Sequence, residues 1–141
     1  MTGSAPTRNL PEPTEISQPF WDATREQRLL LQRCPQCDRS VWYPRAVCPT
    51  CLGDALEWSE ASGRGTVYAM SVHHRAPAAE LADFVPYVVA LVDLDEGVRL
   101  MTNVVGVEPD RVHIGQRVQA TWEPLADGRQ LLLFTPEDSG A

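Results

Sequence analysis

The chain has 141 residues, which is enough for one ordinary domain or two very small ones. Its 19 acidic and 12 basic residues give a net charge of -7, and every basic residue is an arginine. A negative chain disfavours a general nucleic-acid-binding protein, because binding to phosphate needs positive charge. No window approaches the ~20 apolar residues of a membrane span, and residues 1–13 lack the apolar core of a signal peptide. We therefore predict a cytoplasmic protein with no membrane association.

Charge and cysteine content divide the chain into parts. Residues 1–24 are slightly acidic, and residues 25–53 hold five arginines, two acidic residues and all four cysteines. Residues 54–141 hold six arginines against fourteen acidic residues. This pattern predicts a small module between an N-terminal arm and an acidic domain. The predicted parts are a tail and helical arm (1–27), a cysteine-containing ribbon (28–60), a barrel (61–136) and a tail (137–141).

The ends of the chain, residues 1–9 and the last few residues from Pro136, are predicted to be mobile. The first predicted element is a helix that starts near Ser17, which can cap it, with a proline in its first turn. We expect this helix to run to about Gln27, with Phe20 and Trp21 as its apolar anchors. A short strand over residues 28–33 should then lead into the first cysteine pair.

Two C-x-x-C pairs, separated by ten residues, form the strongest motif of the sequence. Each two-residue gap lets one tight turn direct two thiolates at the same point, and two such turns complete a tetrahedral shell with bonds of about 2.3 Å. A closed four-sulfur shell leaves no open position, so the metal would be structural. Zinc is the expected ion and iron the main rival; two disulfides or a redox dithiol fit less well. The expected ligands are Cys34, Cys37, Cys48 and Cys51.

The residue after each cysteine pair is usually a glycine in such knuckles, but here it is Asp38 or Leu52. Aspartate tolerates a left-handed backbone, whereas leucine does so poorly. We therefore expect a slightly remodelled second knuckle.

After the second pair, apolar residues recur with period two between turn signals, of which Asp95-Glu96-Gly97 is the strongest. Five short strands without intervening helices favour a five-stranded OB-fold barrel, although an SH3-like barrel or a small sandwich fits the periodicity nearly as well. The predicted fold is mainly β, with an N-terminal helical arm, a rubredoxin-like zinc ribbon and a C-terminal OB-fold barrel. The predicted barrel strands cover residues 66–73, 86–94, 98–107, 117–123 and 130–135.

Aromatic residues are concentrated in and beside the arm and the ribbon, and a ribbon of this size cannot bury them all. Some must pack between the parts of the chain or line a groove for a ligand or partner. The ribbon arginines form either a solvated face or a grip for phosphates. The candidate contact residues are Phe20, Trp21, Arg25, Trp42, Tyr43 and Arg45. No catalytic motif stands out.

Taken together, these motifs resemble the zinc-ribbon plus OB-fold proteins whose genes commonly accompany thiolase-like enzymes. The resemblance runs from about Ser17 to Phe134, and it depends on the order and spacing of several short motifs. They are Pro19-Phe20-Trp21, Leu30-x-x-x-Cys34-x-x-Cys37, Pro44-Arg45, Cys48-Pro49-x-Cys51, Trp58, Ser62-Gly63-Arg64-Gly65, Pro86-Tyr87, Val92-x-Leu94-x-x-Gly97-x-Arg99-Leu100 and Ile114-Gly115.

The resemblance implies a non-catalytic accessory subunit of an acyl-CoA-processing complex. Its expected partner is a thiolase, a ketosynthase-like acyltransferase or an aldolase of steroid side-chain breakdown, and acyl-CoA is a further candidate ligand. The family's metal ligands correspond to the four cysteines, and no catalytic residue carries over. Two other classes stay open: a single-stranded nucleic-acid-binding protein, and a stand-alone acyl-CoA-binding protein or thioesterase.

Overall fold

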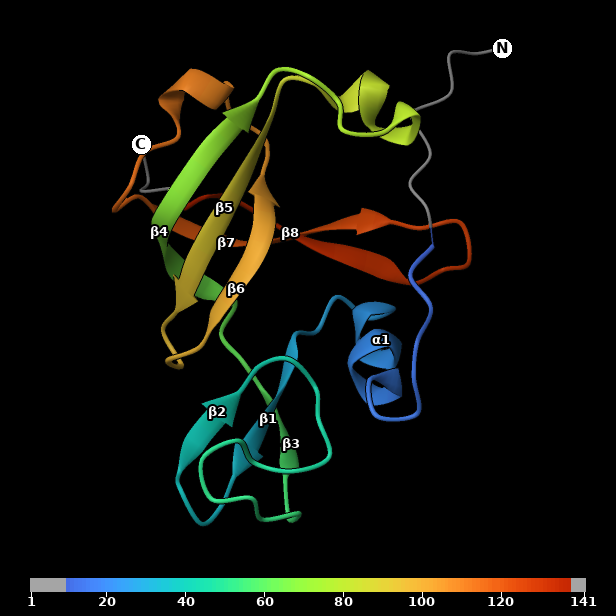
Figure 1. Ribbon diagram of the computed structural model, residues 1–141, viewed down its shortest axis with the longest axis vertical. Coiled ribbons are helices and arrows are strands. Elements are labelled where there is room, and N and C mark those ends of the chain that lie inside the picture. Colours follow the sequence, from blue (N-terminus) through green and yellow to red (C-terminus); the bar gives the residue numbers. More distant parts are fainter. Residues whose placement is uncertain (1–9, 138–141) are drawn as a thin grey trace.

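The computed structural model describes residues 10–137, so most of both predicted tails lies outside the described residues. A short helix and a three-stranded sheet lie at one end of the molecule and a five-stranded barrel at the other (Figure 1). No helix in residues 10–137 is long and apolar enough to cross a bilayer. The elements are α1 (Gln18–Thr24), β1 (Leu30–Cys34), β2 (Arg39–Val41), β3 (Glu57–Glu60), β4 (Arg64–His73), η1 (Ala79–Phe84), β5 (Tyr87–Leu94), β6 (Arg99–Val104), η2 (Pro109–Arg111), β7 (Arg117–Pro124) and β8 (Gln130–Pro136).

Helix α1 forms where the sequence predicts it, with a proline in its first turn. The predicted cap is wrong: Ser17 precedes the helix but makes no side-chain capping bond. Its Oγ accepts a hydrogen bond from the backbone N–H of Thr14 at 2.8 Å, so the hydroxyl is oriented toward the preceding turn. The helix ends at Thr24, before the expected Gln27, which has a φ of 58° and turns the chain toward β1.

The three-stranded sheet, which we call the ribbon sheet, has β1 at its centre and the order β2-β1-β3. Both neighbours run antiparallel to β1, with Cys34 opposite Arg39 and Gln32 opposite Trp58. Leu31 of β1 is buried. Strand β1 therefore carries the chain from the apolar centre of the molecule into the first cysteine pair.

The five remaining strands form a closed barrel in the order β4-β5-β6-β8-β7. The third and last strands of the barrel, β6 and β8, run parallel and pair at Val104 and Phe134, and β4 closes the barrel by pairing with β7. This pairing order is that of the OB-fold, so the structure decides for it against the SH3-like barrel and the sandwich. A register shift between Val67 and Ala69 lets β4 curve and pair with both β5 and β7.

The barrel interior is filled by aliphatic side chains and one phenylalanine. Gly65 lies where β4 crosses β5, and a Cβ there would come within 2.6 Å of the Asp93 carbonyl oxygen. Only glycine permits this close approach of the two strands. The largest fully buried side chains of the barrel, each at most 1% exposed, are those of Val67, Val88, Val92, Val118 and Phe134.

Helix α1 joins the ribbon sheet to the barrel. Phe20 belongs to the same buried cluster as the barrel core, together with Leu29 and Leu31 at the start of the ribbon. The hairpin of β7 and β8 meets the helix: the Gln130 N–H donates to Thr24 Oγ1 at 3.1 Å. One continuous apolar core therefore spans the arm, the inner end of the ribbon and the barrel.

Candidate metal centre and apolar groove

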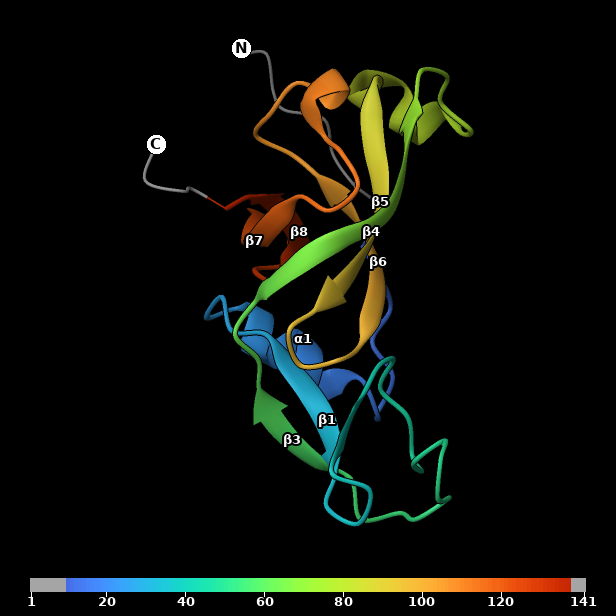
Figure 2. The ribbon, with the colours of Figure 1, turned by 90° about the vertical axis from the view of Figure 1, so that its left-hand side faces the viewer.

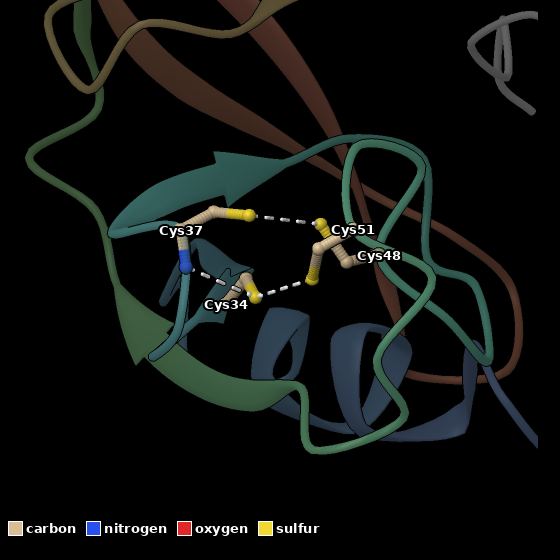
Figure 3. A group of neighbouring side chains, drawn as sticks. All are labelled: Cys34, Cys37, Cys48 and Cys51. Carbon is tan, nitrogen blue, oxygen red and sulfur yellow. Dashed lines mark hydrogen bonds between the residues drawn. The ribbon is translucent and has the colours of Figure 1, made fainter.

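The first cysteine pair lies in a turn that follows β1. The Asp38 N–H donates to the Cys34 carbonyl oxygen at 2.7 Å, which closes the turn, and Asp38 has a φ of 58°. The Cys37 N–H donates to Cys34 Sγ at 3.4 Å. The backbone thus orients both thiols of this pair toward the same side (Figure 3).

The second cysteine pair repeats this geometry, so the predicted remodelling of the second knuckle does not occur. The Leu52 N–H donates to the Cys48 carbonyl oxygen at 2.8 Å, and Leu52 has a φ of 63°. The N–H groups of Thr50 and Gly53 donate to Cys48 Sγ and Cys51 Sγ at 3.4 Å. The left-handed conformation has an intrinsic backbone cost for leucine, which the hydrogen bonds of the turn offset, and the 73% exposure of Leu52 shows that its side chain is not needed in the core.

The two knuckles bring all four sulfur atoms together, with every pair within 4.8 Å (Figure 3). Cys34 Sγ lies 3.6 Å from Cys51 Sγ, and Cys37 Sγ lies 3.9 Å from Cys48 Sγ. A tetrahedral shell with 2.3 Å metal–sulfur bonds has sulfur–sulfur edges of about 3.8 Å. These separations far exceed a disulfide bond of about 2.05 Å, and all four cysteines are free. The cluster therefore has the donors and the geometry to bind a metal ion.

The thiols strongly affect one another's ionisation. Hydrogen bonding to Cys51, then burial and the other two thiols, raise the pKa of Cys37 to about 12. Hydrogen bonds from the backbone N–H groups of Cys51 and Thr50 lower the pKa of Cys48 to about 6. The surroundings thus favour the thiolate of Cys48 and disfavour the thiolate of Cys37. A divalent cation bound here would stabilise all four thiolates, because metal ligation requires the deprotonated form.

The second feature of interest is a groove of about 380 Å³ where the arm, the ribbon and the barrel meet. Four predicted contact residues line it, and their rings contact one another in a chain. The Phe20 ring contacts those of Trp21 and Trp42 edge-on, with centroids 5.1 and 5.4 Å away, and Trp42 contacts Tyr43 at 5.3 Å. Phe20 is buried, the two tryptophans are half-buried and Tyr43 is 58% exposed. The exposure of the four residues thus increases from the core to the surface.

The barrel also lines the groove, and sequence reasoning missed this part of it. It consists of Leu100 and Met101 of β6 and Leu131 and Leu132 of β8. Met101 is 63% exposed although it lies in a strand. Period-two alternation around the buried Leu100 and Thr102 could have placed Met101 on the outer face, but no local pattern places it beside the ribbon.

The two predicted contact arginines point to different places. Arg25 Nη1 donates to the Asp127 carbonyl oxygen at 2.8 Å, on the hairpin of β7 and β8, and Arg25 does not line the groove. Arg45 lies beside the groove: its guanidinium donates to the carbonyl oxygens of Tyr43 and Trp42 at 3.1 and 3.2 Å. The structure thus groups Arg45 with the aromatic residues and separates Arg25 from them.

Comparison with known proteins places this architecture in a family. Residues 21–57 match the domain family described as ChsH2, rubredoxin-like zinc ribbon domain, and residues 58–123 match the one described as ChsH2, C-terminal OB-fold domain. A DUF35 domain-containing scaffold protein of Methanothermobacter thermautotrophicus is 31% identical over 115 residues, which cover 81% of this chain and 86% of that protein. This chain is a member of the DUF35 family. The family assignment inferred from the sequence motifs is therefore confirmed.

Two further relatives of this DUF35 protein are named for enzymes. A solved structure described as Ltp2-ChsH2(DUF35) aldolase contains a chain that is 37% identical, with a TM-score of 0.80 over 90% of this chain and 98% of that one. A probable enoyl-CoA hydratase alpha subunit of Thermomonospora curvata is 40% identical over 118 residues, which are 83% of this chain and 36% of that protein. The chain therefore spans about a third of the length of this hydratase subunit.

Proposed function

We propose that this DUF35 protein is a non-catalytic accessory subunit of an acyl-CoA-processing complex, whose partner is an aldolase, a thiolase or an acyltransferase-like enzyme. The observation that carries the proposal is the likeness, over nearly the whole of both chains, to the ChsH2(DUF35) chain of an aldolase. Similarity to part of an enoyl-CoA hydratase subunit and to a scaffold protein supports the same role. The four free thiols agree with a place in the cytoplasm, where thiols stay reduced.

We infer that the metal at the four cysteines is zinc and that it is structural. The sulfur–sulfur distances of 3.6 and 3.9 Å match a tetrahedral zinc shell, and four thiolates fill every position of such a shell. Zinc bound there supplies folding free energy. Elemental analysis of protein purified without added metal should give one zinc per chain. A visible absorption band of an iron–thiolate centre would identify iron instead.

The predicted contact residues divide into two roles in this proposal. Tyr43 and Arg45 are exposed and meet the partner or its acyl-CoA. Phe20, Trp21 and Trp42 form the wall that holds them in place. Arg25 holds the hairpin of the barrel through the Asp127 carbonyl oxygen, so a ligand that it contacts would lie at this hairpin and outside the groove.

Affinity purification of the tagged chain from its native cells, followed by mass spectrometry, tests the assembly. We expect one enzyme that acts on CoA thioesters to co-purify in near-stoichiometric yield. The recombinant chain should not turn over acyl-CoA alone, whereas the purified partner should lose stability or activity without it. Acyl-CoA hydrolysis by the chain itself would establish the thioesterase alternative. Salt-sensitive retention of a labelled oligonucleotide would instead favour the single-stranded nucleic-acid-binding protein.

A further inference from the structure

The groove exposes apolar side chains from both the ribbon and the barrel. Tyr43 of the ribbon is 58% exposed and Met101 of the barrel is 63% exposed, and both line the same 380 Å³ groove. Apolar groups exposed together in this way mark interaction sites. Tyrosine, tryptophan, methionine and arginine are also the residue types enriched in the cores of protein interfaces. The rim composition therefore favours a protein segment as the occupant of the groove.

Arg45 adds a fixed positive charge to this rim. Its guanidinium is held by two backbone carbonyl oxygens, and within residues 10–137 it forms no ion pair. Two other ribbon arginines differ, since Arg28 pairs with Glu60 and Arg33 with Asp38. The N–H groups of Arg45 that the carbonyls do not use can bind a carboxylate supplied from outside the chain.

Strand β6 contributes a partly open edge. In the described part of the chain, its residues Arg99–Val104 pair along their length with β5, but the pairing with β8 is confined to Val104 and Phe134. Leu100 and Met101, which line the groove, lie on the unpaired stretch of this edge. An unpaired strand edge offers N–H and C=O groups to an extended polypeptide. The groove is thus bordered by backbone groups that suit an extended segment.

We propose that the groove binds an extended segment of the partner subunit, with an apolar side chain inserted between Tyr43 and Met101 and a neighbouring carboxylate on Arg45. The inference rests on the proposed function, because the occupant belongs to the partner subunit proposed above. It adds the docking site on this chain and the chemistry of the segment that the site receives. An acyl chain or a second copy of this chain are the competing occupants, and the test separates them.

The first experiment measures the affinity of the purified chain for its purified partner enzyme. Met101→Glu places a charge in the apolar contact and should weaken binding about tenfold or more. Arg45→Glu should also weaken binding, and more strongly at low salt than at high salt. The matched control is Ile114→Glu, at a position that is 66% exposed in the loop before β7 and does not line the groove. It should bind within about twofold of the native chain.

Because all three side chains are exposed, each variant should keep the thermal unfolding midpoint of the native chain. Equal affinities for all variants, or weakening by Ile114→Glu alone, would overturn the docking site while the accessory role stood. Absence of any partner would instead remove both proposals. If Met101→Glu weakened the binding of decanoyl-CoA but left partner binding unchanged, the occupant of the groove would be an acyl chain.

A photo-reactive amino acid at position 101 identifies the occupant directly. Cross-linking in the complex should join it to a partner segment with an apolar residue next to Asp or Glu, and the same group at position 114 should give no such product. Replacing that acid with Lys should restore binding to Arg45→Glu, which is the double-mutant test of a direct ion pair. Cross-links to a second copy of this chain, or a partner segment without an acid, would refute the proposal.

Discussion

The ribbon and the barrel differ in what fills their interiors. The three strands of the ribbon have only 5, 3 and 4 residues, and at its outer end the buried side chains include Cys34 and Cys48. The barrel strands have 6 to 10 residues, and Phe134 with several valines fills the interior. The barrel can thus be stabilised by burial of apolar area, whereas the outer ribbon, with the metal proposed above, would depend on the bonds of four thiolates to one ion.

The boundary between these two modes of stabilisation runs through the ribbon itself. Strand β1 begins beside the barrel, where Leu29 and Leu31 join the main apolar core, and ends at Cys34 in the first knuckle (Figure 2). The inner half of the ribbon sheet therefore shares the barrel's core, and only the knuckles rely on the metal. This division predicts different outcomes for changes at the two ends of the molecule.

The largest expected effect follows from Cys48→Ser. Cys48 is 1% exposed, and structural zinc contributes about 10–16 kcal/mol in zinc-finger peptides. We expect the variant to lose its metal and the amide signals of residues 34–53 to lose dispersion in NMR spectra, while the barrel signals remain. Thr50→Ala is the control, since Thr50 contacts Cys48 Sγ through its backbone N–H. If the barrel signals of Cys48→Ser also lost dispersion, the barrel as well as the ribbon would depend on the metal.

Phe134→Ala tests the apolar interior of the barrel. Phe134 is fully buried at the single pairing point of β6 and β8, so truncation leaves a cavity and should cost about 3–5 kcal/mol. Urea unfolding monitored by circular dichroism measures this loss, and Ile114→Ala at an exposed site should change the free energy of unfolding by less than about 0.5 kcal/mol. Below the unfolding transition Phe134→Ala should keep its full metal content. Early metal release would show that the barrel core supports the knuckles.

The features predicted correctly from sequence are those that local spacing determines. The two C-x-x-C pairs act within one turn each, and the clustering of the four sulfur atoms was expected from this motif. The Leu52 knuckle was the exception: leucine adopts a left-handed backbone there, and the hydrogen bonds of the turn offset its intrinsic cost. The Ser17 cap was wrong because Thr14, a second local partner, competes for the hydroxyl.

Features that depend on contacts distant in sequence could not be predicted in the same way. The period-two pattern predicted the barrel strands. The order of the strands in the OB-fold depends on the parallel pairing of Val104 and Phe134, which no local pattern encodes. The aromatic rings were expected either to pack between the parts of the chain or to line a groove, because the ribbon could not bury them all. The barrel side of the groove was not expected, because only the folded chain brings Met101 into the same groove as Tyr43.

A smaller effect is expected where helix α1 connects the two regions. The Arg129 side chain is 5% exposed, its Nε lies 2.7 Å from Asp127 Oδ2, and its guanidinium carbon lies 5.0 Å from the Trp21 ring centroid. Arg129→Ala removes this cation–π contact and its packing, at a cost of about 1–2 kcal/mol. Calorimetry should then show the ribbon and the barrel unfolding in separate transitions, whereas the exposed Arg75→Ala should keep the native trace. A single unshifted transition in Arg129→Ala would show that the apolar core alone couples the regions.

The smallest effect concerns the ion pairs on the barrel surface. The guanidinium of Arg117 donates to both Asp95 oxygens, at 2.8 and 3.0 Å, and holds the pKa of Asp95 below its usual value. A carboxyl whose pKa is lowered by folding stabilises the protein above its unfolded pKa of about 3.9, and this contribution is lost as pH falls through the folded pKa. Arg117→Gln should therefore raise the pKa of Asp95, as followed by NMR titration of the side-chain carboxyl. Stability at neutral pH should change little, since both side chains are nearly half exposed and solvent screens the pair. A large loss at neutral pH would show that surface charge, as well as the apolar interior, stabilises the barrel.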